Sequence, residues 1–93
     1  MYNIFFRKEM LYMKDFKIYL IHQNLSNNTV ESYQSSVNYY FREFKEINKQ
    51  NLLAFKAILV DSYKGKTVNL RIQGINKYLE FINKEKLKLK YIK

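Results

Sequence analysis

The sequence predicts an all-α fold, and three observations lead to this prediction. The 93 residues include no proline and only two glycines, so few residues interrupt a helix. Apolar residues recur three and four positions apart in four successive segments, which is the period of an amphipathic helix. Polar residues of the types that cap helices stand between these segments. With 47% hydrophobic residues, a chain of this length is expected to fold as one small domain.

A short polar connection separates the first two expected helices. The first runs from about Met10 to His22, and the second begins at Ser26, a residue type that often caps a helix. Their apolar faces consist of Phe16, Tyr19 and Leu20 in the first helix and of Val30, Tyr33, Val37, Tyr40, Phe41 and Phe44 in the second. Because each set follows helical spacing, we expect both faces to be buried.

The third helix is expected from just after Asn48 to about Val60, and the fourth from about Lys66 to Asn83. Their apolar faces consist of Leu52, Phe55, Ile58 and Leu59 in the third helix and of Val68, Ile72, Ile75, Leu79 and Ile82 in the fourth. Further apolar residues surround much of the fourth helix, which predicts a central position in the bundle. Gly74 stands inside this helix, where glycine costs about 1 kcal/mol relative to alanine. We therefore expect a neighbouring element to approach closely there.

The last ten residues show a different pattern. Leu87, Leu89 and Tyr91 alternate with lysines, and a period of two indicates an extended segment or a linker. The expected organisation is an N-terminal extension over residues 1–9, a helical domain over residues 10–83 and a linker over residues 84–93.

The charge balance points to a polyanionic partner. Seventeen Lys and Arg residues face eight Asp and Glu residues, which gives a formal net charge of +9. Nucleic acid is the commonest partner of so basic a domain, and an anionic membrane surface or an acidic protein is the alternative. A general compositional bias toward lysine would produce the same charge. Most of the cations are lysines, which predicts more contact with phosphates than with base edges.

Several classes of chemistry are not expected. The chain has no cysteine and a single histidine, His22, so neither a disulfide nor a zinc site is expected. The sequence contains no glycine-rich phosphate-binding loop, and its carboxylates are scattered among lysines as on a solvated helix face. We therefore expect no cofactor, no metal and no catalytic residue. No apolar run approaches the length of a membrane span, so no membrane partner and a cytoplasmic location are expected.

Candidate nucleic-acid contacts gather at two helix N-termini and along the polar faces that follow them. Helix N-termini bind phosphates through free N–H groups and the helix dipole, and short polar side chains suit a major groove. The candidates are Asn28, Thr29, Ser32, Ser35, Arg42, Lys64, Lys66, Thr67, Asn69, Arg71, Gln73 and Lys77. Ser36 is assigned to the same polar face of the second helix. The two helices also repeat their apolar offsets from Thr29 and Thr67. Ordinary capped helices with a solvated face would produce the same patterns.

Four motifs in this order resemble a known family. They are Phe16-x-x-Tyr19-Leu20, Leu25-Ser26-Asn27-Asn28-Thr29-Val30-x-x-Tyr33, Ile47-x-x-x-x-Leu52 and Lys66-Thr67-Val68-Asn69-x-Arg71-Ile72-x-Gly74-Ile75-x-x-Tyr78-Leu79-x-Phe81. Together they resemble the N-terminal core-binding domain of phage integrases, the tyrosine recombinases. The resemblance covers about residues 10–82.

The resemblance implies a four-helix SAM-like bundle that forms one half of a clamp around duplex DNA. It implies that the second and fourth helices lie toward the major groove. The partners it implies are double-stranded DNA, the catalytic domain of the same parent chain and other recombinase protomers on the DNA. The function it implies is the positioning of that catalytic domain for integration or recombination, in a prokaryotic cytoplasm or encoded by a phage or mobile element.

Three residues depart from what a DNA-reading surface would favour. Glu31 places a carboxylate where some relatives carry a basic residue, so the second helix is expected to contribute less than the fourth. Leu70 and Gly74 occupy turns that could otherwise carry base-reading side chains. The alternative function is that of a free-standing basic helical domain that binds an acidic protein or an anionic membrane surface.

Overall fold

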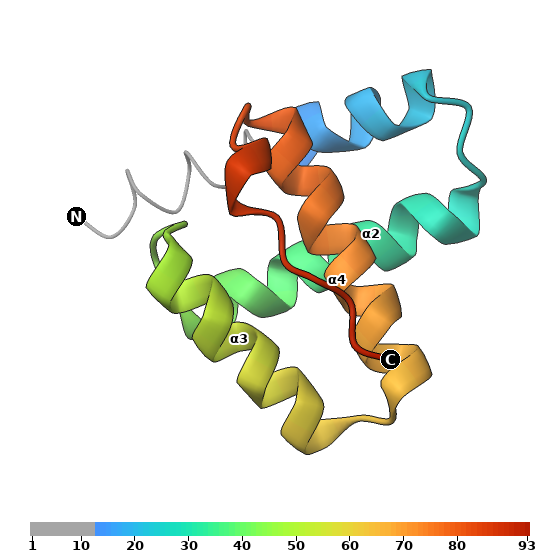
Figure 1. Cartoon of the computed structure of the whole chain (residues 1–93). Coiled ribbons are helices and arrows are strands. Elements are labelled where there is room, and N and C mark those ends of the chain that lie inside the picture. Colours follow the sequence, from blue (N-terminus) through green and yellow to red (C-terminus); the bar gives the residue numbers. More distant parts are fainter. Residues whose placement is uncertain (1–12) are drawn as a thin grey trace.

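A computed structural model describes residues 13–93 as four α-helices, a short 3-10 turn and an extended C-terminal segment (residues 88–93), and these residues contain no strand (Figure 1). Residues 13–22 are helical and are followed by α2 (Asn27–Glu43), α3 (Lys49–Ser62), α4 (Gly65–Phe81) and the turn η1 (Glu85–Leu87). The all-α fold expected from the sequence is confirmed. The expected helix start at Met10 and the extension over residues 1–9 lie outside the described residues.

Local hydrogen bonds set the starts of two helices as the sequence predicts. The Ser26 hydroxyl accepts a hydrogen bond from the Thr29 backbone N–H at 3.2 Å and caps α2. The Asn48 side chain accepts from the Asn51 N–H at 2.7 Å and caps α3. Helix α4 begins at Gly65, and within residues 13–93 no side chain caps its start. The backbone N–H groups of its first turn are therefore left without a side-chain acceptor from these residues.

The end of α4 turns the chain back along the same helix. Asn83 takes a left-handed backbone conformation with φ 61°, which asparagine tolerates better than most residues. The Asn83 N–H donates to the Glu80 carbonyl at 3.1 Å, and the Lys84 N–H donates to the Leu79 carbonyl at 2.8 Å. These two bonds form a Schellman motif, which satisfies carbonyls at the helix end.

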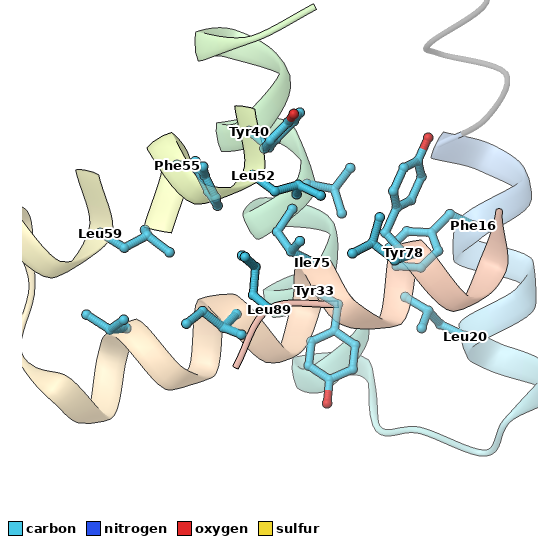
Figure 2. Packing of buried hydrophobic residues seen from close by; sticks show 14 of the residues in the cluster. Phe16, Leu20, Tyr33, Tyr40, Leu52, Phe55, Leu59, Ile75, Tyr78 and Leu89 are labelled. Atoms are coloured by element: carbon cyan, nitrogen blue, oxygen red, sulfur yellow. The ribbon is translucent and has the colours of Figure 1, made fainter. Parts of the chain in front are cut away.

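The hydrophobic core confirms the predicted apolar faces, and α4 lies at its centre between α2, α3 and the C-terminal segment (Figures 1 and 2). Four of the five predicted core residues of α4 are fully buried, and Ile82 is half-buried. The buried apolar residues are Phe16, Leu20, Val30, Tyr33, Val37, Tyr40, Leu52, Phe55, Leu59, Val68, Ile72, Ile75, Tyr78, Leu79 and Leu89. All four helices therefore contribute to one core.

Helices α2 and α4 cross at Gly74, as the position of this glycine predicts. A Cβ atom added to Gly74 would lie 2.9 Å from Cβ and 2.9 Å from Oγ of Ser36, and 3.1 Å from Cα of Tyr33. The prediction that Ser36 belongs to the solvated face of α2 is wrong, because this crossing buries it. The Ser36 hydroxyl donates to the Ser32 carbonyl at 3.2 Å, which satisfies it inside the contact.

Tyr40 joins the end of α2 to the connection that precedes α3. Its ring packs edge-on against Phe55 with 5.2 Å between the ring centroids, and its hydroxyl donates to the Glu46 carbonyl at 2.5 Å. The Asn51 side chain donates to the same carbonyl at 3.1 Å. Burial of the ring raises the pKa of Tyr40 to about 12.

This raised pKa predicts a loss of stability in alkali. The neutral hydroxyl of Tyr40 is favoured in the folded state, so its contribution is complete below pH 10 and is lost as the pH rises from 10 to about 12. The full loss from this residue is roughly 3 kcal/mol. We expect Tyr40→Phe to flatten the fall in the urea midpoint above pH 10. The Glu46 carbonyl keeps the Asn51 bond in this variant, so only a modest cost is expected at pH 7.

Burial also raises the pKa of a second tyrosine, Tyr33. Part of the loss of stability in alkali is therefore expected to remain in Tyr40→Phe. An unchanged pH dependence in Tyr40→Phe would contradict the prediction. The comparison requires unfolding curves of both proteins at several pH values between 8 and 12.

Candidate nucleic-acid interface

Three adjoining open hollows lie over one face of α2 and α4. Their volumes are about 480, 380 and 300 Å³. Gln73, which is exposed on α4, lines all three, and Leu70 lines the largest and the smallest. We call the residues that line these three hollows the Gln73 face.

The Gln73 face brings together polar residues from the starts of both helices. Asn28, Thr29 and Ser32 of α2 line the smallest hollow together with Gln73. Lys66, Thr67 and Asn69 of α4 line the largest hollow, and Lys77 lines the third. Eight of the twelve predicted contact residues therefore lie on one continuous face, although they come from helices about forty residues apart in sequence.

The remaining four predicted contact residues lie elsewhere. The guanidinium carbons of Arg42 and Arg71 lie 5.3 and 5.7 Å from the centre of the Tyr39 ring, and that of Arg71 lies 5.2 Å from the Tyr63 ring. These are cation–π contacts that hold both arginines against aromatic rings. Ser35 and Lys64 are exposed and line none of the three hollows.

Three of the predicted residues on the Gln73 face have side-chain partners within the chain. The Asn69 amide bonds to the backbone of Ile92 in the C-terminal segment. The Lys77 ammonium lies 3.5 Å from a Glu80 carboxylate oxygen. The Thr29 hydroxyl accepts a hydrogen bond from the Ser26 hydroxyl at 3.0 Å. Lys66 makes no ion pair within residues 13–93.

The Gln73 face also includes an ion pair, because Glu80 and Lys88 line one of the hollows. Lys88 lies 2.6 Å from the second Glu80 oxygen. The hydrogen bond from Lys88 lowers the pKa of Glu80, and the same bond raises the pKa of Lys88. Because Lys77 and Lys88 neutralise Glu80, this carboxylate adds little repulsion toward an anion. Glu31 is exposed on α2 and lines none of the three hollows.

The family model of the N-terminal SAM-like domain of phage integrases matches residues 13–86, which is most of the chain. The chain belongs to this family. No curated protein and no solved structure matches it significantly.

The SAM-like domain is a non-catalytic domain of these integrases, and the four helices described above agree with its all-α bundle. Within residues 13–93, no three His, Asp or Glu side chains gather as metal ligands. None of the helices over the same residues has the length and hydropathy needed to cross a bilayer.

The polar residues of this face that the sequence does not predict as contacts are Tyr33, Asn76, Glu80, Lys88 and Tyr91. Tyr91 of the C-terminal segment lines two of the hollows, and the buried Asn76 lines one of them. Leu89 and Tyr91 both alternate with lysines, but Leu89 is buried while Tyr91 is 53% exposed. The sequence does contain a signal that the two asparagines act together, because Asn69 and Asn76 are seven positions apart and therefore share one face of the helix.

Proposed function

We propose that this SAM-like domain binds duplex DNA through the Gln73 face and positions the catalytic domain of a tyrosine recombinase on its recombination site. The observation that carries the proposal is the meeting of the α2 and α4 starts on one face, where Lys66, Thr67 and Gln73 line the largest hollow. Other recombinase protomers bound to the same DNA, in a prokaryotic cell, are the further partners of this role.

The start of α4 is the proposed phosphate contact. Its N–H groups have no side-chain cap within residues 13–93, whereas the starts of α2 and α3 are capped by Ser26 and Asn48. The positive end of the helix dipole and the exposed Lys66 ammonium add favourable charge at the same place. The net charge of +9 supplies long-range attraction to a polyanion.

Base contact is proposed for the centre of the face. Gln73 is exposed between the two helix starts, and its amide can both donate and accept hydrogen bonds at a base edge. Arg42 and Arg71 are held against Tyr39 and are proposed as peripheral contacts at most. Phosphate contacts thus outnumber base contacts in this arrangement, in keeping with the excess of lysine over arginine.

The loss of one phosphate contact should be visible in the salt dependence. We expect Lys66→Ala to weaken binding to all duplexes about equally and to lower the slope of log affinity against log salt by about one unit. The physical reason is that one fewer counterion is released from the DNA when the domain binds. The measurement is fluorescence anisotropy with labelled duplexes of unrelated sequence at four or more salt concentrations.

Lys49→Ala is the matched control, because Lys49 is an exposed lysine in the first turn of α3 and lines none of the three hollows. We expect this variant to keep the slope of the parent chain. Equal slopes for Lys66→Ala and the parent would show that the Gln73 face does not dock on DNA. Binding to anionic vesicles without binding to duplex would instead support the membrane-binding alternative.

A further inference from the structure

The C-terminal segment is held on α4 by two asparagines. The Asn76 side chain donates to the Leu89 carbonyl at 2.9 Å and accepts from the Leu89 N–H at 2.8 Å. The Asn69 side chain donates to the Ile92 carbonyl at 2.8 Å and accepts from the Ile92 N–H at 2.8 Å. Each amide thus satisfies both backbone groups of one residue, as a neighbouring strand would do.

The spacing of the two asparagines matches the extended segment. Seven residues of α-helix rise about 10 Å, and three residues of extended chain span about 10 Å. Asn76 pairs with Leu89 and Asn69 pairs with Ile92, so the segment runs antiparallel to α4 and ends near its start (Figure 1). Because a shift by one residue would break all four bonds, this geometry selects one register.

Packing supports the same register. Leu89 is buried in the core with only 6% of its surface exposed (Figure 2). Ile92 is half-buried, and its Cδ1 atom would lie 3.5 Å from a Cβ added to Gly65 at the start of α4. Lys56 of α3 donates to the Lys90 carbonyl at 2.7 Å. The segment therefore packs on the helices in an extended conformation, which is one of the two alternatives that its sequence pattern predicts.

This docking places Tyr91 on the Gln73 face. Tyr91 lies between the two anchored residues and is exposed. It lines the largest hollow together with Lys66 and Gln73. A tyrosine hydroxyl can donate a hydrogen bond to a phosphate oxygen, and because it adds no positive charge it displaces no counterion from the DNA.

We propose that Tyr91 is a DNA-contact residue whose hydroxyl donates to a backbone phosphate, and that Asn69 and Asn76 are positioning residues that hold Tyr91 in place. This inference rests on the proposed DNA-binding function. It reassigns Asn69, because both polar atoms of its side chain bond to the Ile92 backbone, which directs the amide toward the C-terminal segment.

A double-mutant cycle tests the inference, with the affinity for a labelled duplex as the readout. We expect Tyr91→Phe to weaken binding roughly fivefold to tenfold, the value of one lost hydrogen bond, and to leave the salt slope unchanged. Asn69→Ala should cause a similar loss. The double variant should bind no more weakly than the weaker single variant, because both changes remove the same contact.

Amide hydrogen exchange separates positioning from misfolding. In Asn69→Ala the Ile92 amide should exchange faster, while the Leu89 amide stays protected by Asn76. Tyr91→Phe should leave both amides protected. Asn38→Ala removes an exposed asparagine of α2 that lines none of the three hollows, so it should change neither affinity nor exchange.

Two outcomes would overturn the inference while the proposed function stands. One is unchanged affinity in Tyr91→Phe when Lys66→Ala still lowers the salt slope. The other is additive losses in the cycle, which would mean that Asn69 contacts DNA directly. Absence of duplex binding by the parent chain would overturn both the proposed function and the role of Tyr91, although the exchange data would still report the docked segment.

Discussion

We expect Leu79→Ala to lower the free energy of unfolding by roughly 2–5 kcal/mol. Leu79 is fully buried on the central helix, where α2, α3 and the C-terminal segment surround α4. Truncation removes apolar contacts and leaves a cavity that the neighbouring helices fill only in part. Because small domains have little stability to spare, this loss could unfold much of the population at room temperature. The measurement is urea unfolding followed by circular dichroism.

Leu70→Ala is the matched control for this prediction. It changes the same residue type on the same helix, but Leu70 is 47% exposed. We expect its loss to be well below that of Leu79→Ala, since most of the removed surface is already in water. A loss of less than about 1 kcal/mol for Leu79→Ala would contradict the central position of α4 in the core.

Gly74→Ala should also destabilise the domain, by roughly 1–3 kcal/mol, and Gly74→Val by more. Two effects oppose each other here. Alanine is favoured over glycine inside a helix by about 1 kcal/mol. Its Cβ, however, would lie 2.9 Å from Ser36 Cβ and 3.1 Å from the Tyr33 backbone, which is closer than carbon atoms pack. Because the Tyr33 backbone belongs to α2, relief requires the two helices to move apart.

Two further variants sharpen this test. Ser36→Gly combined with Gly74→Ala moves the small residue to the other side of the crossing, and it should recover part of the loss. Gly65→Ala is the control, because a Cβ at Gly65 meets only Ile92 Cδ1 at 3.5 Å, an ordinary contact distance. Gly65→Ala should therefore be neutral or slightly stabilising. A gain of stability in Gly74→Ala would mean that α2 and α4 do not cross closely at this position.

Much of the fold follows from local rules that can be read along the chain. Helical spacing identifies the core residues because a residue's face on a helix depends only on its position. The caps at Ser26 and Asn48 and the need for a small residue at Gly74 can be predicted for the same reason. The motifs then indicated the SAM-like family, and the family model over residues 13–86 confirms it.

The candidate face could be predicted only in part. The sequence predicts contacts at Thr29 and Thr67, near the starts of α2 and α4, and the fold brings both residues to adjoining hollows. Whether these residues contact DNA stays a prediction. The placement of Arg71 against Tyr39 and Tyr63 has no signal in the sequence, because Arg71 lies in α4, Tyr39 in α2 and Tyr63 just after α3.

The helices, most of their buried faces and the family can be predicted from the amino-acid sequence alone. Which polar side chains become buried or engaged depends on how the helices and the C-terminal segment pack together. Ser36 is buried because α2 and α4 cross beside it, and Asn69 and Asn76 are engaged because the C-terminal segment returns along α4. The physical reason is that a polar side chain suits water and a hydrogen-bonded interior equally well. Its surroundings therefore depend on which elements pack together, and local periodicity does not contain that information.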